Sequence, residues 1–309
     1  MKNNALFVGN FSKKLAFGFV FLLFFGNLAA QNLDSLARAM AQARQSYDEK
    51  NYYKQDSLAE KPLGLIYKLA TPARFVCSDV ALNAYIISEK NEILSFGPQG
   101  ETLGRYTNDK LGAAGSIDCS NPSAILVWYP DFHTVVWLDA SLTELGRLDL
   151  RKFDLSNANI LAAGSDQTLW VYDDVNFQLK NIDKMGKTRY SSQNLTQILG
   201  KTPKPNGIQE YEQSVFMGDE STGFYVFDKF AQYQKTIVAA TVRGFQVTDN
   251  KLRYFDEGLI KEIFTKNTTF KRAVPPPPQV KKDDTVYIQK RRIYVLRPDG
   301  FEAWFLGMQ

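Results

Sequence analysis

The chain has 309 residues, which is enough for one large β domain or two domains of average size. Its 44% apolar and 23% charged residues are typical of a globular protein, and its 22 Phe, 15 Tyr and 4 Trp favour strands. The formal net charge is +4, but Lys2, Lys13 and Lys14 lie in an N-terminal segment that we expect to be removed. The remaining charge, near +1, argues against a strongly basic domain that binds nucleic acid or an anionic membrane.

Residues 1–30 are a predicted secretory signal. The pair Lys13-Lys14 precedes an apolar core, Leu15–Gly26, and Ala29-Ala30 precedes Gln31 at a suitable cleavage point. The alternative is an uncleaved anchor, but a membrane-spanning helix needs about 20 apolar residues and this core is shorter. No later stretch is apolar for long enough to span a bilayer, so we expect no transmembrane segment in the mature chain.

The signal also indicates a cellular location. Its Phe-rich core and Ala-Ala-Gln junction resemble the signals of exported proteins from Bacteroidota-type Gram-negative bacteria. Cys77 is the first cysteine after the core, so no lipid-attachment cysteine follows the cleavage point. Surface cargo of such bacteria carries a C-terminal sorting domain, whereas the last repeat here continues to Gln309. We therefore expect a periplasmic protein, at or near the inner face of the outer membrane.

Residues 31–62 are predicted to form an amphipathic helix followed by a linker. Within residues 32–50, apolar side chains recur every three or four positions, as one face of a helix requires; they are Leu33, Leu36, Met40, Ala43 and Tyr47. A single helix of this length is marginal in water unless it packs against something. The helix is expected either to pack on the following domain or to dock on a partner through Leu33, Leu36, Met40 and Tyr47.

From residue 63 onward the chain is a series of short apolar runs and turns. The pattern is plainest at residues 169–187, LWVYDDVNFQLKNIDKMGK, and it indicates two consecutive strands that end in Asp and a tight turn. Six copies of the pattern align. The positions that close the second run of each copy are spaced by 42, 44, 45, 28 and 41 residues; they are Gly97, Asp139, Asp183, Asp228, Asp256 and Arg297.

A period in the low forties with paired strands inside it predicts an all-β fold, a six-bladed β-propeller over residues 63–309. A sandwich would not sustain one period for this length, and a membrane barrel would alternate strictly between apolar and polar residues. The short interval before Asp256 predicts a fifth blade with an abbreviated inner strand or connection. The termini are expected to close the ring, with either Leu63–Leu69 or Phe301–Leu306 as the outermost strand of the last blade.

Residues 63–309 resemble six-bladed propellers of the NHL and gluconolactonase-like kind. The resemblance is carried by the repeated apolar run followed by Asp, a turn and Gly. Lactonase-type members of that group bind Ca²⁺ in the central channel, so the resemblance leaves a Ca²⁺ cofactor open. No motif assigns its ligands here, and Glu89, Asp219 and Asp249 are expected to lie in solvated turns rather than in a metal site.

Most of the other polar candidates are better explained by structure than by chemistry. Asp139, Asp183, Asp228 and Asp256 fall in different repeats, so they are expected to bond backbone N–H groups in their own turns. The one histidine, His133, lies in a turn and has no second histidine for a metal cluster. No glycine-rich phosphate loop or Gly-x-Ser-x-Gly motif occurs, and the sequence predicts no catalytic residue and no cofactor site.

Two further features could shape the fold or bind a partner. Cys77 and Cys119 are separated by 42 residues, equal to the first repeat interval, and should occupy equivalent inner-strand positions in adjacent blades. They form either a disulfide, which a periplasmic location permits, or two buried thiols. The run Pro275, Pro276, Pro277 and Pro278 predicts a stiff segment, either a connection between blades or a docking element for an aromatic groove.

These observations favour a non-catalytic periplasmic binding or scaffold protein, an accessory of an outer-membrane assembly or secretion complex, with a protein partner. Two alternatives remain. One is a Ca²⁺-dependent lactonase or hydrolase acting in the central channel. The other is a sensor of small molecules or glycans that uses exposed aromatic residues, and it requires that Trp128, Trp137, Trp170 and Trp304 are not all buried between blades.

Overall fold

The computed structural model describes residues 64–153, 155, 157–239, 242–269 and 271–306. The contacts divide the chain into two units, Met1–Glu60 and Lys61–Gln309, and the described residues belong to the second. The predicted signal and the predicted helix with Leu33, Leu36, Met40 and Tyr47 therefore lie outside the described residues. Within them, no helix is long and apolar enough to cross a membrane.

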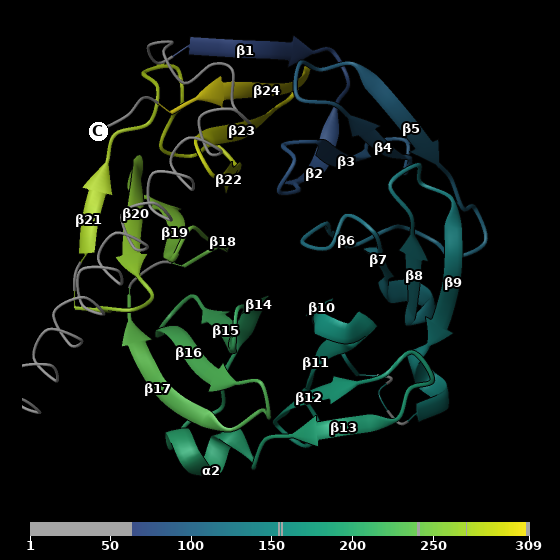
Figure 1. Cartoon of the computed structure of the whole chain (residues 1–309), viewed down its shortest axis with the longest axis vertical. Helices are drawn as coiled ribbons and strands as arrows, with labels where there is room; N and C mark the ends of the chain where they lie inside the picture. The colour runs from purple at the N-terminus through teal and green to yellow at the C-terminus, as the bar shows by residue number, and fades with distance from the viewer. Residues whose placement is uncertain (1–63, 154, 156, 240–241, 270, 307–309) are drawn as a thin grey trace, which may run out of the picture. The chain divides into compact units, whose positions relative to one another are not determined.

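The described residues form a ring of six four-stranded antiparallel sheets, the blades (Figure 1). Blades 1 to 3 contain, from the inside outward, β2 (Ala73–Ser78), β3 (Ala84–Ser88), β4 (Ile93–Phe96) and β5 (Thr102–Tyr106); β6 (Ser116–Asp118), β7 (Ile125–Tyr129), β8 (Thr134–Leu138) and β9 (Glu144–Asp149); and β10 (Ile160–Ala163), β11 (Leu169–Asp173), β12 (Gln178–Ile182) and β13 (Thr188–Ser191).

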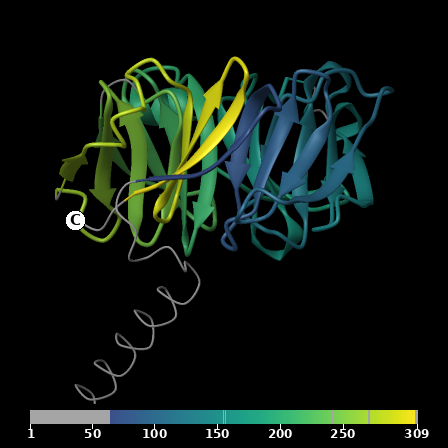
Figure 2. The same cartoon turned by 90° about the horizontal axis from the view of Figure 1, so that it is seen from above.

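Blades 4 to 6 repeat this arrangement. They contain β14 (Pro205–Tyr211), β15 (Ser214–Asp219), β16 (Gly223–Asp228) and β17 (Tyr233–Val238); β18 (Phe245–Thr248), β19 (Lys251–Asp256), β20 (Leu259–Phe264) and β21 (Lys271–Val274); and β22 (Val286–Gln289), β23 (Arg292–Arg297), β24 (Gly300–Phe305) and β1 (Gly64–Leu69). One short helix, α2 (Leu195–Leu199), follows β13. Seen edge-on in Figure 2, the blades stand side by side around the ring. The prediction of a six-bladed β-propeller is confirmed.

The N-terminal strand closes the ring. β1 pairs antiparallel with β24, from Gly64 opposite Phe305 to Leu69 opposite Phe301, and so becomes the outermost strand of blade 6. Gly300, at the start of β24, has a φ of +155°, and a Cβ there would collide with the carbonyl of Leu69. Closure by the termini is therefore confirmed, and the structure places the N-terminal strand outside the C-terminal one.

The prediction of an abbreviated fifth blade is wrong. Blade 5 has four strands, and Asp256 ends its second strand, β19, whereas Asp228 ends the third strand of blade 4. The equivalent position in blade 5 is Thr265, directly after β20. Arg297 likewise ends the second strand of blade 6. The predicted alignment of the fifth and sixth copies is therefore one strand too early, because neighbouring strands in these blades are all short and rich in apolar residues.

The core lies between the blades. Strands β3, β7, β8 and β11 are buried at every position, because a neighbouring blade covers each face of the sheet. Between blades 2 and 3, for example, Leu126 and Trp137 pack in one cluster with Leu161 and Val171. Each such side chain contributes about 1.5–3 kcal/mol relative to an exposed position.

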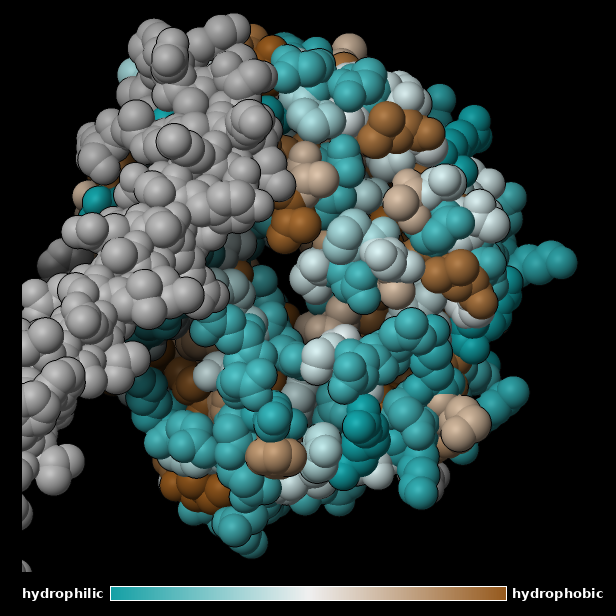
Figure 3. Space-filling model, in the orientation of Figure 1, coloured by the Kyte–Doolittle hydropathy of each residue, from teal (hydrophilic) through white to brown (hydrophobic). Residues whose placement is uncertain are grey.

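All four tryptophans belong to these layers. Trp128, Trp137, Trp170 and Trp304 are exposed by 3%, 5%, 1% and 8%. The hypothesis of an aromatic sensor therefore loses the exposed tryptophans on which it depended. Figure 3 shows one face of the ring, on which the described residues are mainly hydrophilic, with isolated hydrophobic side chains and an opening at the centre.

Candidate functional site

The recurrent aspartates close the turns between the third and fourth strands. The Oδ1 atom of Asp183 accepts hydrogen bonds from the backbone N–H groups of Met185 and Lys187, at 2.9 and 3.0 Å. Asp139 and Asp228 make the same pair of bonds two and four residues ahead. The expected turn role is confirmed for these three. It is not observed for Asp256, which ends a second strand.

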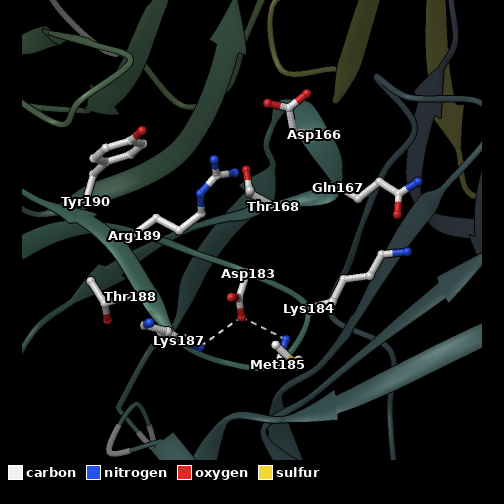
Figure 4. Close-up of a pocket in the computed structure, with 10 residues that line it drawn as sticks. All are labelled: Asp166, Gln167, Thr168, Asp183, Lys184, Met185, Lys187, Thr188, Arg189 and Tyr190. Carbon is white, nitrogen blue, oxygen red and sulfur yellow. Dashed lines mark hydrogen bonds between the residues drawn. The ribbon is translucent and has the colours of Figure 1, made fainter.

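The turn at Asp183 borders a hollow of about 600 Å³ on blade 3 (Figure 4). The other wall is the connection between β10 and β11, and the start of β13 completes the lining. The lining residues are Asp166, Gln167, Thr168, Asp183, Lys184, Met185, Lys187, Thr188, Arg189 and Tyr190. Figure 4 shows the guanidinium of Arg189 directed toward Thr168, and the two backbone bonds to Asp183 at the base of the turn.

Local bonds hold both walls of the hollow in shape. Thr168 is buried; its hydroxyl donates to the carbonyl of Ser165 at 2.7 Å and accepts from the Asn181 side chain at 2.9 Å. Asp166 and Gln167, before it, adopt left-handed backbone conformations, with φ of +55° and +59°. On the opposite wall, Gly186 has a φ of +81°, and a Cβ there would collide with the ring of Phe153 in the preceding segment. Neither wall can change easily without rearranging its neighbours.

The rim of the hollow combines positive charge with exposed apolar side chains. Among the described residues, Lys184, Lys187 and Arg189 have no carboxylate in ion-pair range; Arg189 lies over the ring of Tyr190, with its guanidinium carbon 5.8 Å from the centroid. Met185 is 75% exposed. The rings of Tyr190 and Phe230 meet edge to face with centroids 5.3 Å apart, so the rim continues onto blade 4.

Phe230 occupies in blade 4 the position that Met185 has in blade 3, two residues after the turn aspartate, and each follows a lysine. Phe230 is 48% exposed, and the ammonium of Lys229 lies 5.2 Å from its ring centroid. We call the residues Lys184, Met185, Lys187, Arg189, Tyr190, Lys229 and Phe230 the blade 3–4 surface. Sequence reasoning missed it, although the repeated Asp-Lys-Met and Asp-Lys-Phe turns are a signal that could have revealed it.

Polar side chains near the centre of the ring bind backbone groups of the next blade. Gln209 of blade 4 accepts from the backbone N–H of Val247 at 2.7 Å and donates to its carbonyl at 3.1 Å. Gln246 of blade 5 accepts from Ile288 of blade 6 at 2.9 Å. Between blades 2 and 3, the carboxylate of Asp118 accepts from Ala163 at 2.8 Å. These side chains therefore hold the ring together.

Blades 3 and 4 are joined in the same way. The carboxylate of Glu210, on β14, accepts from the backbone N–H of Ser165 at 3.1 Å and from the indole N–H of Trp170. Ser165 begins the wall of the hollow, so this contact fixes the position of the wall relative to blade 4. Sequence reasoning missed these polar residues between blades.

The remaining acidic candidates lie apart from one another. Glu89 and Asp249 are exposed turn residues in blades 1 and 5, as expected. Asp219, in contrast, is buried, and it accepts from the backbone N–H groups of Lys204 and Ser221 at 2.8 and 3.0 Å. Burial would raise its pKa, but these hydrogen bonds outweigh burial and lower the pKa below its usual value. Among the described residues, no group of three or more His, Cys, Asp or Glu is arranged to hold a metal ion.

His133 has a conformational role in the turn between β7 and β8. It adopts a left-handed backbone conformation with a φ of +48° after the short helix Pro130–Phe132. Its ring lies edge to face against Trp128, with centroids 6.2 Å apart.

Cys77 and Cys119 face each other across blades 1 and 2. Both are buried thiols in the structure, and their Sγ atoms lie 2.6 Å apart. Burial raises the pKa of both thiols, and that of Cys119 lies well above its ordinary value. The repeat spacing thus placed the two residues side by side, and the disulfide between them stays a prediction.

Pro275–Pro278 lie in the connection between β21 and β22, that is, between blades 5 and 6. Pro277 is buried and its carbonyl accepts from the backbone N–H of Val280 at 2.9 Å, whereas Pro275 and Pro278 are exposed. Val280 packs among Ile260 and Ile288. The proline segment is therefore anchored on the propeller, and a docking role for it stays a prediction.

Comparison with known proteins supports the fold. No protein-family model and no curated protein matches the chain. A streptogramin B lyase structure is similar with a TM-score of 0.56 and 12% identity, over 80% of this chain and 98% of that one. A catalytically inactive variant of virginiamycin B lyase from Staphylococcus aureus, with quinupristin, gives a TM-score of 0.52 and 12% identity, over 80% of this chain and 89% of that one.

A third structure, BamB from Moraxella catarrhalis, has a TM-score of 0.43 and 10% identity, over 76% of this chain and 83% of that one. At these identities the likenesses concern the fold alone, because propellers of one architecture carry unrelated functions. The protein is therefore a six-bladed β-propeller, and its narrower kinship to NHL or gluconolactonase-like propellers stays a prediction.

Proposed function

We propose that this protein is a non-catalytic, exported binding propeller that holds a protein partner at the blade 3–4 surface. The observation that carries the proposal is that equivalent turns of two neighbouring blades each present an exposed apolar side chain after a lysine, Met185 in blade 3 and Phe230 in blade 4. Apolar side chains gathered among polar ones on a surface mark sites of protein interaction. Met and aromatic residues are also the types that partner interfaces favour.

Polar side chains that join neighbouring blades differ from those of the blade 3–4 surface, and this difference supports the same proposal. Gln209, Gln246, Asp118 and Glu210 are engaged by backbone or indole N–H groups of the neighbouring blade. They serve the stability of the ring. Among the described residues, Lys184, Lys187 and Arg189 of the blade 3–4 surface have no carboxylate in ion-pair range. Arg189 and Lys229 lie over aromatic rings of the same surface, so these positive charges are available to a partner.

The location of this function is a separate proposal. It rests on the predicted signal at residues 1–30 and on the absence of a lipid-attachment cysteine there. With those features, we propose a periplasmic protein whose partner belongs to an outer-membrane assembly or secretion complex. Detection of the mature chain in the periplasmic fraction after osmotic shock would support it, and retention of the full chain in the cytosol would contradict it.

Site-specific photocrosslinking tests the proposed function. A photoreactive phenylalanine replaces Met185 in the full chain, expressed in the source cells. The matched control places the same group at Val175, an exposed apolar residue (58%) in the turn at the opposite end of β12. We expect a discrete adduct with a protein from position 185 and none from position 175. Equal labelling at both positions, or no adduct at either, would refute the proposal.

A further inference from the structure

We infer that the blade 3–4 surface recognises an acidic peptide segment that also carries an apolar side chain. The inference rests on the proposed function and specifies the chemistry of the partner. Carboxylates of the segment would face Lys184, Lys187 and Arg189 around the hollow. Its apolar side chain would cover Met185 at the rim of the hollow, and a second one could cover Phe230.

The basic side chains of the propeller differ in whether a carboxylate lies beside them. Some are paired: Lys180 binds Asp173 at 2.6 Å, and Arg147 binds Glu144 at 2.7 Å. At the hollow, three basic side chains from one turn and the adjoining strand stand together and none has a carboxylate in ion-pair range among the described residues. Such a cluster attracts an anionic ligand, and its attraction increases when the ligand displaces water.

The aspartates of the two turns accept hydrogen bonds that hold the turns in shape. Asp183 accepts the two backbone bonds that close its own turn. In the next blade, Asp228 accepts two backbone bonds with Oδ1 and one from the Gln234 side chain with Oδ2. These aspartates shape the turns that present the lysines.

The shape of the hollow favours a peptide over an anionic membrane. A hollow of about 600 Å³ can receive side chains of a chain segment, whereas a lipid surface would only touch its rim. Asp166 and Asp183 within the lining repel lipid phosphates and peptide carboxylates alike. A polypeptide, however, also offers backbone N–H groups that a carboxylate such as Asp166 can accept. The mixed lining therefore matches a polypeptide that carries both acidic and apolar side chains.

Fluorescence anisotropy with the mature full chain tests the inference. The probe is a short fluorescein-labelled peptide in which Glu alternates with Leu and Phe, and its neutral twin has Gln in place of every Glu. We expect the acidic peptide to bind with a dissociation constant below about 1 mM and the neutral twin to bind at least about tenfold more weakly. A parallel measurement of binding to vesicles of phosphatidylglycerol and phosphatidylethanolamine tests whether the protein binds an anionic membrane instead.

Paired charge reversals locate the site. We expect the double variant Lys184→Glu and Arg189→Glu to weaken binding of the acidic peptide by at least about tenfold, because two attractions become repulsions. The control, Lys90→Glu with Lys110→Glu, changes the net charge equally at exposed positions of blade 1 and its exit loop, and should bind like the wild type. Exchange of the cation types, Lys184→Arg with Arg189→Lys, should retain binding.

Three results would overturn the inference: no binding of the acidic peptide at about 1 mM, equal weakening by the blade 1 control, or vesicle binding that is lost in the site variant while the acidic peptide does not bind. These outcomes are separable from the proposed function. A protein adduct at position 185 without binding of the acidic peptide would leave the function intact and refute only the partner chemistry. Absence of the adduct would refute the function itself.

Discussion

Oxidation of Cys77 and Cys119 to a disulfide should stabilise the propeller strongly. The two thiols would lose two electrons and two protons to a disulfide acceptor, by thiol–disulfide exchange. The bond would close a loop of 42 residues that joins the inner strands of blades 1 and 2. In the chain-entropy treatment such a loop contributes about 4 kcal/mol at 25 °C. For a domain of this size, that corresponds to a rise in Tm of about 8–16 °C.

Burial determines when the bond can form. Because burial raises the pKa of both thiols, few thiolates exist in the folded state, and the thiolate is the species that exchanges. We therefore expect oxidation before blades 1 and 2 close, and slow reduction of the folded protein by dithiothreitol. Refolding under oxidising and under reducing conditions should give two species that differ in Tm.

The assay combines thermal unfolding with thiol counting. Protein refolded with oxidised glutathione is denatured in iodoacetamide without reductant, and its intact mass is measured. We expect no alkylated cysteine, and a Tm that falls after reduction in denaturant and refolding. The double variant Cys77→Ala with Cys119→Ala should show no dependence of Tm on reductant. Two alkylated cysteines in the oxidised sample, or equal Tm values for both wild-type samples, would refute the reasoning.

Three further predictions concern bonds within and between blades. Gln209→Ala leaves the N–H and carbonyl of the buried Val247 without their partner, and should lower the free energy of unfolding by about 1–3 kcal/mol in urea titrations. Gln209→Glu keeps the acceptor for the Val247 N–H but sets a carboxylate oxygen against the Val247 carbonyl, so it should also lower the free energy of unfolding. An unchanged free energy of unfolding in both variants would contradict the role of Gln209. Burial would raise the pKa of Glu262, but bonds from Arg272 and Arg253 outweigh burial and lower it. Glu262 therefore contributes its full stabilisation at pH values above about 4.3, its pKa in the unfolded state. This stabilisation is lost as the pH falls through the lower pKa that Glu262 has in the folded state. In Glu262→Gln, the fall of Tm at acidic pH should be less steep than in the wild type. An equally steep fall would count against the ion pairs of Glu262 with Arg253 and Arg272. Asp183→Ala, which removes the acceptor of two turn N–H groups, should cost about 1–2 kcal/mol, whereas Asp183→Asn keeps the acceptor and should cost less by the same urea titration. Equal losses for these two variants would show that the turn bonds contribute little.

Local patterns in the sequence were enough to predict the architecture. Strands such as β7 and β11 are buried throughout and, apart from Asp173, carry apolar or aromatic side chains, because neighbouring blades cover both of their faces; that pattern recurs with the period of a blade. The turn aspartates were also predictable, because the Oδ1 atoms of Asp139, Asp183 and Asp228 accept from backbone N–H groups two and four positions ahead.

The same local reasoning failed where neighbouring strands look alike. The segments that end at Thr248 and Asp256 are the first and second strands of blade 5, but their composition is that of the second and third strands of other blades. Only the pairing of strands assigns each to its place. The sequence also left undetermined which terminal strand is outermost in blade 6. The pairing of β1 with β24 shows that it is β1.

What the sequence by itself determined is thus the repeating strand, its turn and the number of blades, because these depend on contacts between residues close in the chain. The tertiary structure alone decided the bonds from Gln209 to Val247 and from Glu210 to Ser165, whose partners lie 38 and 45 residues away. It also decided that Tyr190, on β13 of blade 3, meets Phe230 in a turn of blade 4, which joins the two blades in one surface. Such contacts depend on how blades stack around the ring. The repeat interval located the pair Cys77 and Cys119, which occupy equivalent positions, but it does not locate pairs of side chains at non-equivalent positions.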